Sequence, residues 1–446
     1  MKILLQNADW LIRDSQRIEQ NGAVLIDKDR IVSVGSTTEV ERHEPESKDV
    51  EVIDCKGCIL MPGLSNAHNH VFQLSERGLG KNLTMEEWLR KLIYPINKIL
   101  DADDYYALAT MACADLFRNG VTSMVEQLTN FARFHAESEC RAFFDCGMRA
   151  AVARGISTQS TIDPGENADP GEECRNARKY IEDWQGKGLV QPWIGPAGMY
   201  STDQTTLKLM KDLCIEAGVG FHIHLSETRQ QAEFARQQGY SGQVDWAYRL
   251  GLLDERTSVA HAVWINPAEI ELLRQTGAKP VHNPSSNQIL SSGVANVPMW
   301  MEKGLSIALG TDGPASNDSL DMIAEMKSCV LLHRVNTLNP NIISASDAFK
   351  MATEGGAAVL GLTGKLGKLD PGYLADVACV RYEGNPSLNP IYNPIEALVY
   401  YGSGRDVCMT IVNGNIVYHN GRYLSLDIDS SIRDIRRIAE KVKTHL

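Results

Sequence analysis

Short apolar runs alternate with longer segments of helical spacing through the middle of the chain. The runs lie at 59–64, 122–125, 149–152, 190–194, 220–225, 258–263, 280–281 and 306–309, and the helical segments include 103–118, 203–217, 267–276 and 321–333. Uninterrupted apolar runs are typical of parallel strands that are buried on both faces. Eight such strands, each followed by a helix, predict an α/β protein with a (β/α)8 TIM barrel.

Both ends of the chain instead show the pattern of antiparallel strands and turns. Apolar segments at 23–26 and 31–35 flank a polar turn, and those at 408–412 and 415–418 flank Asn413-Gly414, a strong hairpin signal. We therefore expect a small β-sandwich domain built from both chain ends. The predicted division is 1–58 and 366–446 for this domain, with a terminal helix at about 428–444, and 59–365 for the barrel.

A doubly wound open sheet is the competing architecture for the middle of the chain. That fold binds phosphate groups through a glycine-rich turn directly after its first strand. The run at 59–64 is followed by Ser65-Asn-Ala-His68, which is no such turn. The barrel is therefore favoured.

Composition and charge narrow the choice of partners. The net charge is −12 and the chain contains no Lys/Arg-rich run, which argues against nucleic acid or an anionic membrane. The N-terminal segment is not a signal peptide, and no run of about 18 apolar residues is present. Ten scattered cysteines are expected to be reduced thiols, as in the cytoplasm. The pair Cys55 and Cys58 has no second C-x-x-C partner, so we interpret it as structural.

Histidines and acids gather where the predicted barrel strands end, which is where such barrels place catalytic groups. Side chains two positions apart in a strand share a face, so each H-x-H pair can point to one ion. Taken singly, each of these residues could be a buried core residue or a helix cap. Together they predict a metal site; they are His68, His70, His222, His224, Glu227, His261, His282 and Asp312.

The motifs P-G-L-x-N-x-H-x-H, H-x-x-E, H-N-P-x-S-N and G-T-D-G-x-A-S-N-D together resemble the amidohydrolase superfamily, over nearly the whole chain. The closest resemblance is to its cytosine-deaminase-like aminohydrolases. It implies a divalent metal held by His68, His70, His224 and Asp312, with zinc expected and Fe(II) or Mn(II) as alternatives. Because the fourth strand has no lysine to bridge two ions, one metal per chain is expected.

The resemblance also implies roles in catalysis. Glu227 would be the proton shuttle, Asp312 would take a proton from the attacking water, and His261 would orient that water. The reaction would be hydrolysis of an exocyclic amine on an N-heterocycle, with release of ammonia, by a protein that forms a homodimer or a larger homo-oligomer. Expected substrate contacts are Trp88, Glu126, Arg154, His282 and Asn287.

The motifs are compatible with three classes of substrate ring. The segments 86–88 and 147–155 resemble the thioadenosine deaminases, which favours a purine or thioadenosine ring. Gly195-Pro-Ala197-Gly198 is more similar to the triazine hydrolases, and deaminases of 8-oxoguanine or isocytosine are a third possibility.

Overall fold

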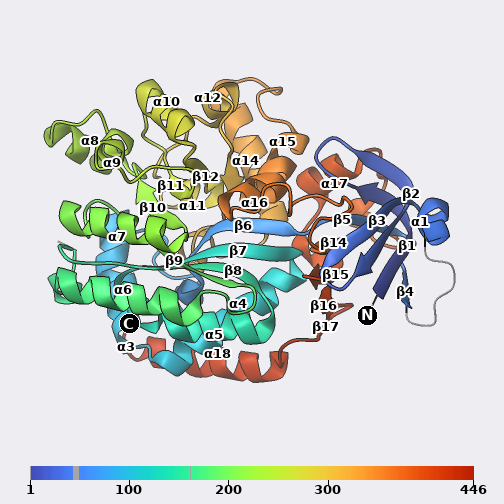
Figure 1. Cartoon of the computed structure of the whole chain (residues 1–446), viewed down its shortest axis with the longest axis horizontal. Coiled ribbons are helices and arrows are strands. Elements are labelled where there is room, and N and C mark those ends of the chain that lie inside the picture. Colours follow the sequence, from blue (N-terminus) through green and yellow to red (C-terminus); the bar gives the residue numbers. More distant parts are fainter. Residues whose placement is uncertain (1, 44–49, 161) are drawn as a thin grey trace.

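Eight parallel strands, adjacent in the order in which they occur in the chain, form a barrel at the centre of the molecule (Figure 1). The computed structural model describes residues 2–43, 50–160 and 162–446. The barrel strands are β6 (Leu64–Asn69), β7 (Val121–Leu128), β8 (Arg149–Arg154), β9 (Val190–Ile194), β10 (Phe221–Leu225), β11 (Thr257–His261), β12 (Lys279–His282) and β13 (Ala308–Leu309). The predicted (β/α)8 barrel is confirmed.

The seam between β13 and β6 nearly closes the barrel. Just beyond β13, the Asp312 N–H donates to the His68 carbonyl at 3.0 Å, and the Thr311 N–H donates to the Asn66 side-chain oxygen at 3.0 Å. Gly310 permits this approach, because a Cβ there would lie 2.8 Å from the backbone nitrogen of His68. The seam therefore places Asp312 beside the histidines of β6.

The predicted first barrel strand, at 59–64, is wrong in its extent. Residues 59–62 belong to β5 (Cys58–Pro62), which pairs with β1 and β14 in a second sheet, and the barrel begins with β6 after Gly63. Every residue of β5 and β6 is buried. An unbroken apolar run cannot mark the point where the chain leaves one sheet and enters another.

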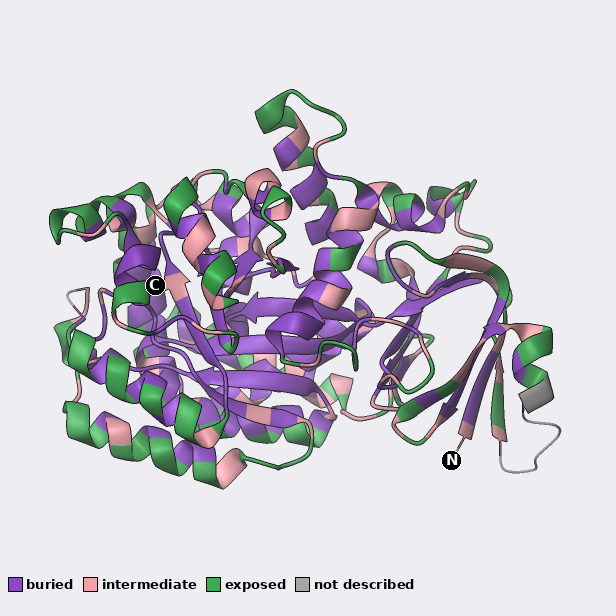
Figure 2. Ribbon diagram, turned by 45° about the horizontal axis from the view of Figure 1, so that its top comes forward, coloured by how far each residue is buried: buried purple, intermediate pink, exposed green. Residues whose placement is uncertain are grey.

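Helices cover the outside of the barrel, with buried faces toward the strands and exposed faces toward solvent (Figure 2). They begin at side-chain caps such as Asp203 for α7 and Asn266 for α10. The longer ones are α4 (Ala102–Arg118), α5 (Ala136–Cys146), α6 (Pro170–Trp184), α7 (Gln204–Ala217), α8 (Arg229–Gln237), α9 (Gln243–Arg249), α10 (Pro267–Thr276), α14 (Met322–Thr337) and α17 (Pro394–Tyr401). Shorter ones are α2 (Met85–Trp88), α3 (Tyr94–Ile99), α11 (Pro284–Ile289), α12 (Val297–Glu302), α13 (Pro314–Asn317), α15 (Ala345–Lys350) and α16 (Gly356–Val359). The helix α1 (Thr37–His43) lies on the second sheet, away from the barrel.

Both chain ends build a nine-stranded mixed sheet beside the barrel, as predicted (Figure 1). Its strands follow the order β17-β16-β15-β14-β5-β1-β2-β3, with β4 also paired to β1. One apolar core contains residues from β2, β1, β5, β14 and β15, so this continuous sheet bends around its own interior. Besides β5, the strands are β1 (Lys2–Ile12), β2 (Ile18–Asp27), β3 (Arg30–Ser36), β4 (Val50–Asp54), β14 (Val377–Arg381), β15 (Val407–Val412), β16 (Asn415–His419) and β17 (Arg422–Tyr423).

Two sets of ion pairs fasten the chain end to the barrel. Arg149 of β8 pairs with the buried Asp376 at 2.8 Å. The terminal helix α18 (Ile428–Lys443) lies against α4, where Arg437 and Lys441 donate to Asp104 at 2.7 and 2.6 Å. In the described part of the chain no helix is long and apolar enough to cross a membrane. The exact domain limits at 58 and 365 stay predictions.

Candidate active site

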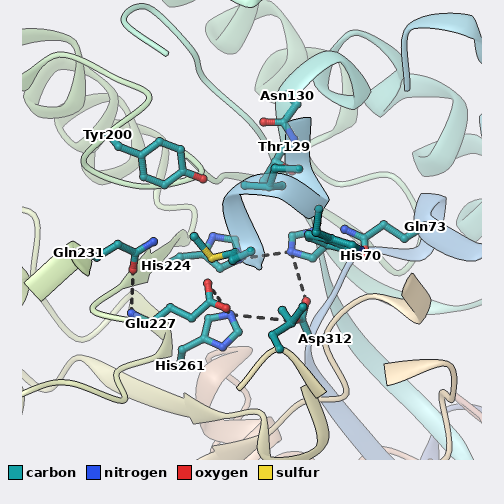
Figure 3. A pocket seen from close by; sticks show the side chains of 14 residues that line it. His70, Gln73, Thr129, Asn130, Tyr200, His224, Glu227, Gln231, His261 and Asp312 are labelled. Atoms are coloured by element: carbon teal, nitrogen blue, oxygen red, sulfur yellow. Dashed lines mark hydrogen bonds and ion pairs between the residues drawn. The ribbon is translucent and has the colours of Figure 1, made fainter. Parts of the chain in front are cut away.

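The first H-x-H motif directs both of its imidazoles into one cluster at the carboxyl end of the barrel. His68 lies in β6 and His70 directly follows it, and their ring centroids are 4.8 Å apart. The Nε2 atoms of both histidines lie 3.5 Å from Oδ1 of Asp312. Figure 3 shows the contact of His70. Residues that are about 240 positions apart thus meet at the barrel seam.

The second H-x-H motif, in β10, divides its histidines between two layers. Nε2 of His224 lies 3.2 Å from Nε2 of His70 and belongs to the cluster. His222 lies beneath it, with Nε2 at 2.8 Å from Nδ1 of His68 and Nδ1 at 2.6 Å from the Ser258 hydroxyl. His222 therefore holds His68 in place.

The donor set fits a divalent cation. His70 and His224 donate their Nδ1–H groups to the carbonyls of Gln127 and Ala197 at 2.5 and 2.8 Å, so both Nε2 lone pairs point at each other. Nε2 of His68 is buried without a hydrogen-bond partner among the described groups. Facing lone pairs repel unless a cation lies between them, and backbone carbonyls behind ligand histidines are typical of metal sites.

Protonation in the cluster matches what a metal requires. Burial lowers the pKa of His68 to about 3 and also lowers the pKa values of His70 and His224. Burial alone would raise the pKa of Asp312, but the imidazoles that face its carboxylate, with His68 at 3.5 Å, lower it well below its ordinary value. Neutral imidazoles and an ionised carboxylate are the forms that bind metals.

The backbone at Asp312 is held in an unusual conformation. Its φ is +61°, in the left-handed region that non-glycine residues rarely adopt. The Ser286 hydroxyl donates to Oδ2 and the Gly313 N–H donates to Oδ1, both at 2.6 Å. Such strain is typical of functional sites, where the surrounding structure imposes it.

His261 lies at the end of β11 with one ring nitrogen aimed at the two acids. Its Nδ1 accepts from the Asn287 amide at 2.9 Å, so Nε2 carries the proton. That Nε2–H group points between Glu227 at 3.8 Å and Asp312 at 3.9 Å (Figure 3). His261 is therefore a hydrogen-bond donor to whatever lies between these carboxylates.

Glu227 lies beside His261, and its surroundings favour the protonated form of its carboxyl group. It is buried, and this burial raises its pKa above the ordinary value. The Ser292 hydroxyl donates to its Oε1 at 3.3 Å, and its N–H donates to the Gln231 side chain at 2.8 Å. Glu227 and Asp312 thus occupy one site with pKa values that are shifted in opposite directions, which is the pattern of an acid and a base.

A cavity lies above these groups, with about 480 Å³ of space between the atoms when its open mouth is included. In Figure 3, Glu227, His261 and Asp312 line one side of it, and Tyr200, Thr129 and Asn130 line the opposite side. The remaining lining residues are His70, Gln73, Met85, Trp88, Leu89, His224, Gln231 and Leu290. The cavity therefore offers apolar contacts for a ring and several polar groups near its mouth.

The structure brings one of the five expected substrate contacts, Trp88, to the cavity lining. Asn287 reaches the site only through His261. Glu126 is buried and accepts both of its bonds, at 2.9 and 3.0 Å, from the N–H of Val71. It therefore supports the turn after His70, and its side chain is not part of the cavity lining.

Arg154 and His282 also point away from the cavity. Arg154 makes a buried ion pair with Glu173 of α6 at 2.7 Å. Nε2 of His282 lies 3.1 Å from Nε2 of His333 on α14, behind the strand. The direction of a strand side chain depends on the phase of the pleat, which the apolar runs do not reveal.

Sequence reasoning missed the polar lining residues Thr129, Asn130, Tyr200 and Gln231. Thr129 and Asn130 directly follow β7, so the rule that sites form at strand ends could have found them. Gln231 completes the capping box of α8 with Thr228, a pattern that suggests only a helix start. Tyr200 lies in a loop with no periodic signal.

Comparison with known proteins decides the family. A model of the amidohydrolase family matches residues 59–417. The chain belongs to the amidohydrolase family. It is thus a hydrolase that acts on C–N bonds, and the predicted resemblance is confirmed.

Two curated relatives of this amidohydrolase match it along nearly its whole length. The 5-methylthioadenosine/S-adenosylhomocysteine deaminase of Nitratidesulfovibrio vulgaris is 34% identical, with 98% of this chain and 97% of the relative covered. The 5'-deoxyadenosine deaminase of Methanosarcina mazei is 33% identical, with 99% and 98% covered.

Solved structures share the fold of this amidohydrolase. A zinc-bound adenosine deaminase from Xanthomonas campestris has a TM-score of 0.92 at 24% identity, with 99% of this chain and 98% of the other covered. A triazine hydrolase from an Arthrobacter aurescens source has a TM-score of 0.91 at 23% identity, with 98% and 99% covered. At these identities the likeness shows the fold alone.

Proposed function

We propose that this amidohydrolase hydrolyses the exocyclic amino group of an adenosine-type nucleoside that is altered at its 5' position, and releases ammonia. The observation that carries the proposal is the cavity floor, where the buried acid Glu227 faces His261 and the ionised Asp312. The two relatives at 34% and 33% identity, which are named for such nucleosides, support the choice of ring.

His68, His70, His224 and Asp312 would hold one divalent ion, for which zinc is our choice. Nitrogen and carboxylate ligands with room for a water molecule suit catalytic zinc. When bound, the ion would polarise a water molecule and lower its pKa toward neutrality. The fourth barrel strand, β9, contains no lysine that could bridge a second ion, which supports a single ion.

The chain's own groups can move each proton that the reaction requires. Asp312, ionised and fixed by Ser286, takes a proton from the attacking water. The Nε2–H of His261 hydrogen-bonds to the oxygen of that water and orients it. Glu227, whose pKa is raised by burial, protonates the ring nitrogen next to the amine-bearing carbon.

Attack by water and departure of ammonia complete the reaction. Attack of the water oxygen forms a C–O bond and gives a tetrahedral carbon. The proton taken from water then passes to the amino group, the C–N bond breaks, and ammonia leaves. The proton that remains on the added hydroxyl returns to Glu227, which restores the acid. One water molecule is consumed, and a carbonyl replaces the amine on the ring.

The cavity lining suits a flat ring with a polar appendage. Trp88, Leu290 and Met85 supply apolar surface, and Tyr200 and Asn130 supply polar groups near the mouth. A triazine-type substrate is the second candidate, because the segment after β9 has the Gly-Pro-Ala-Gly form, with Ala197 as its third residue. The Ala197 carbonyl orients His224, but its side chain adds no polar group toward a ribose.

A substrate panel tests the proposal. Metal-loaded protein is assayed for ammonia release from 5'-methylthioadenosine, 5'-deoxyadenosine, adenosine, an aminated triazine and 8-oxoguanine. We expect kcat/KM to be at least about tenfold higher for the two 5'-altered nucleosides than for the other rings, a difference of ~1.4 kcal/mol in transition-state binding. Release of ammonia from the triazine alone would favour the second candidate, and no release from any ring would contradict both.

Three finer expectations accompany the proposal. We propose zinc as the native ion, a homo-oligomer as the assembly and the cytoplasm as the location. Metal analysis of the purified protein, its mass in solution and cell fractionation test these in turn.

A further inference from the structure

Cysteines from both ends of the chain meet inside the nine-stranded sheet. Cys58 begins β5, Cys379 lies in β14 and Cys408 lies in β15, and β14 is hydrogen-bonded between the other two strands. The three Sγ atoms lie within 4.8 Å of one another, and all three residues are buried. Strand pairing thus gathers thiols that are more than 300 residues apart in the chain.

A fourth cysteine lies next to this group in the chain, at the start of a tight turn. Cys55 precedes Cys58 in the C-x-x-C segment, and the Cys58 N–H donates to the Cys55 carbonyl at 3.1 Å. Gly57 has a φ of +71°, which lets the turn close. The buried Cys55 belongs to the same core as the other three, and its thiol donates to the Ile53 carbonyl at 3.8 Å, outside the group of three close sulfurs. A turn of its side chain would make it the fourth ligand.

The spacing of the thiols suits one soft metal ion. Tetrahedral zinc holds thiolates at about 2.3 Å, which sets neighbouring sulfurs ~3.8 Å apart. The three Sγ atoms already lie within about an ångström of that separation. A disulfide would require about 2.05 Å between two sulfurs, and the described cysteines are free thiols.

The surroundings also favour bound thiolates. The guanidinium of Arg381 interacts with Cys58, Cys379 and Cys408, and would offset part of the negative charge of a zinc–thiolate group. Cys408 retains 9% exposure, whereas the other three cysteines are almost fully covered, so an ion can reach the site from its side.

We propose that Cys55, Cys58, Cys379 and Cys408 form a structural zinc site that ties β5 to β14 and β15. The site is separate from the cluster of His68, His70, His224 and Asp312 at the carboxyl end of the barrel, which we call the barrel mouth. It takes no part in the chemistry there. Closed four-cysteine sites contribute folding energy and leave no open position for substrate. The ion would clamp the N-terminal and C-terminal portions of the sheet together.

Zinc content per chain tests the proposal on the full-length protein. Protein purified anaerobically is loaded with zinc, washed free of unbound ion and measured by mass spectrometry of the metal. We expect two zinc ions in the unaltered protein and one in His68→Ala, which loses only the mouth ion. Cys379→Ser should also hold one ion, and Cys214→Ser, a matched buried cysteine on α7, should hold two.

Cobalt supplies a readout that does not depend on the stability of a cysteine variant. Cobalt-loaded His68→Ala should show the intense near-ultraviolet charge-transfer absorption of thiolate-bound cobalt. Cys408→Ser in the same background should weaken it, and Cys214→Ser should not. Absence of thiolate absorption and of zinc from His68→Ala, or equal zinc in Cys379→Ser and Cys214→Ser, would overturn the proposal.

Discussion

The barrel mouth and the nine-stranded sheet each bring together metal-binding side chains from distant strands. The two groups of side chains differ in what surrounds them. At the mouth, backbone carbonyls fix His70 and His224, and a cavity lies above the cluster. In the sheet, the thiols of Cys58 and Cys379 are enclosed by the apolar core. An open position suits catalysis, whereas enclosure suits structure.

The mouth also carries strain that the sheet cluster does not. His261 and Asp312 have φ values of +69° and +61°, whereas none of the four cysteines has a positive φ. Glu227 and Asp312 have pKa values that are shifted in opposite directions within one site. Strained, oppositely tuned groups around a cavity distinguish the site that acts on a substrate.

His68→Ala should have the largest effect and should separate the two regions. It removes a ligand whose Nε2 lies 3.5 Å from Asp312, so the mouth ion should be lost and ammonia release should fall to the background rate. The measurement is turnover together with zinc content. His419→Ala, on β16, is the matched control and should change neither. Full turnover in His68→Ala would contradict the metal assignment at the mouth.

Glu227→Gln should lower turnover without removing the ion from the barrel mouth. Loss of the carboxyl group that donates the proton should lower turnover by ~10²–10⁴-fold, the range for general acid–base catalysis. Zinc content should stay as in the unaltered protein. Glu233→Gln, at an exposed residue of α8, the helix that follows Glu227, should keep normal turnover. Near-normal turnover in Glu227→Gln would show that another group is the acid.

Arg149→Met should weaken the connection between the two regions. It leaves the buried carboxylate of Asp376 without its partner, and such losses cost about 3–5 kcal/mol. The free energy of unfolding in guanidinium measures the effect. Arg178→Met breaks an exposed pair with Glu216 and should cost less than about 1 kcal/mol. Equal costs for the two variants would mean that the buried pair does not fasten the sheet to the barrel.

Glu76→Gln should have the smallest effect, on the pH dependence of stability. Burial raises the pKa of Glu76 from 4.5 to about 8, so between these values the folded protein binds more protons than the unfolded chain. Stability should therefore fall as pH rises from about 5 to about 8. The glutamine variant should reduce this fall by ~1 kcal/mol or more, measured by unfolding at both pH values. An unchanged fall would mean that Glu76 is ionised in the folded protein.

The sequence could predict the barrel and the donors at its mouth, because both depend on local patterns. His68 and His70 lie two positions apart at a strand end, and the G-T-D segment marks Asp312. The directions of Arg154 and His282 depend on pleat phase and on the helices behind the strands, so their contacts could not be predicted. The meeting of Cys58 with Cys379 and Cys408 depends on strand order in the sheet, which no local motif encodes.

Removal and return of the metal tests the central claim most directly. Protein freed of metal by a chelator is titrated with zinc, and ammonia release from 5'-methylthioadenosine is followed beside the bound zinc. We predict no release from the metal-free protein, and recovery in proportion to the zinc that binds the unaltered protein but not His68→Ala. Continued release of ammonia by the metal-free protein would contradict the account.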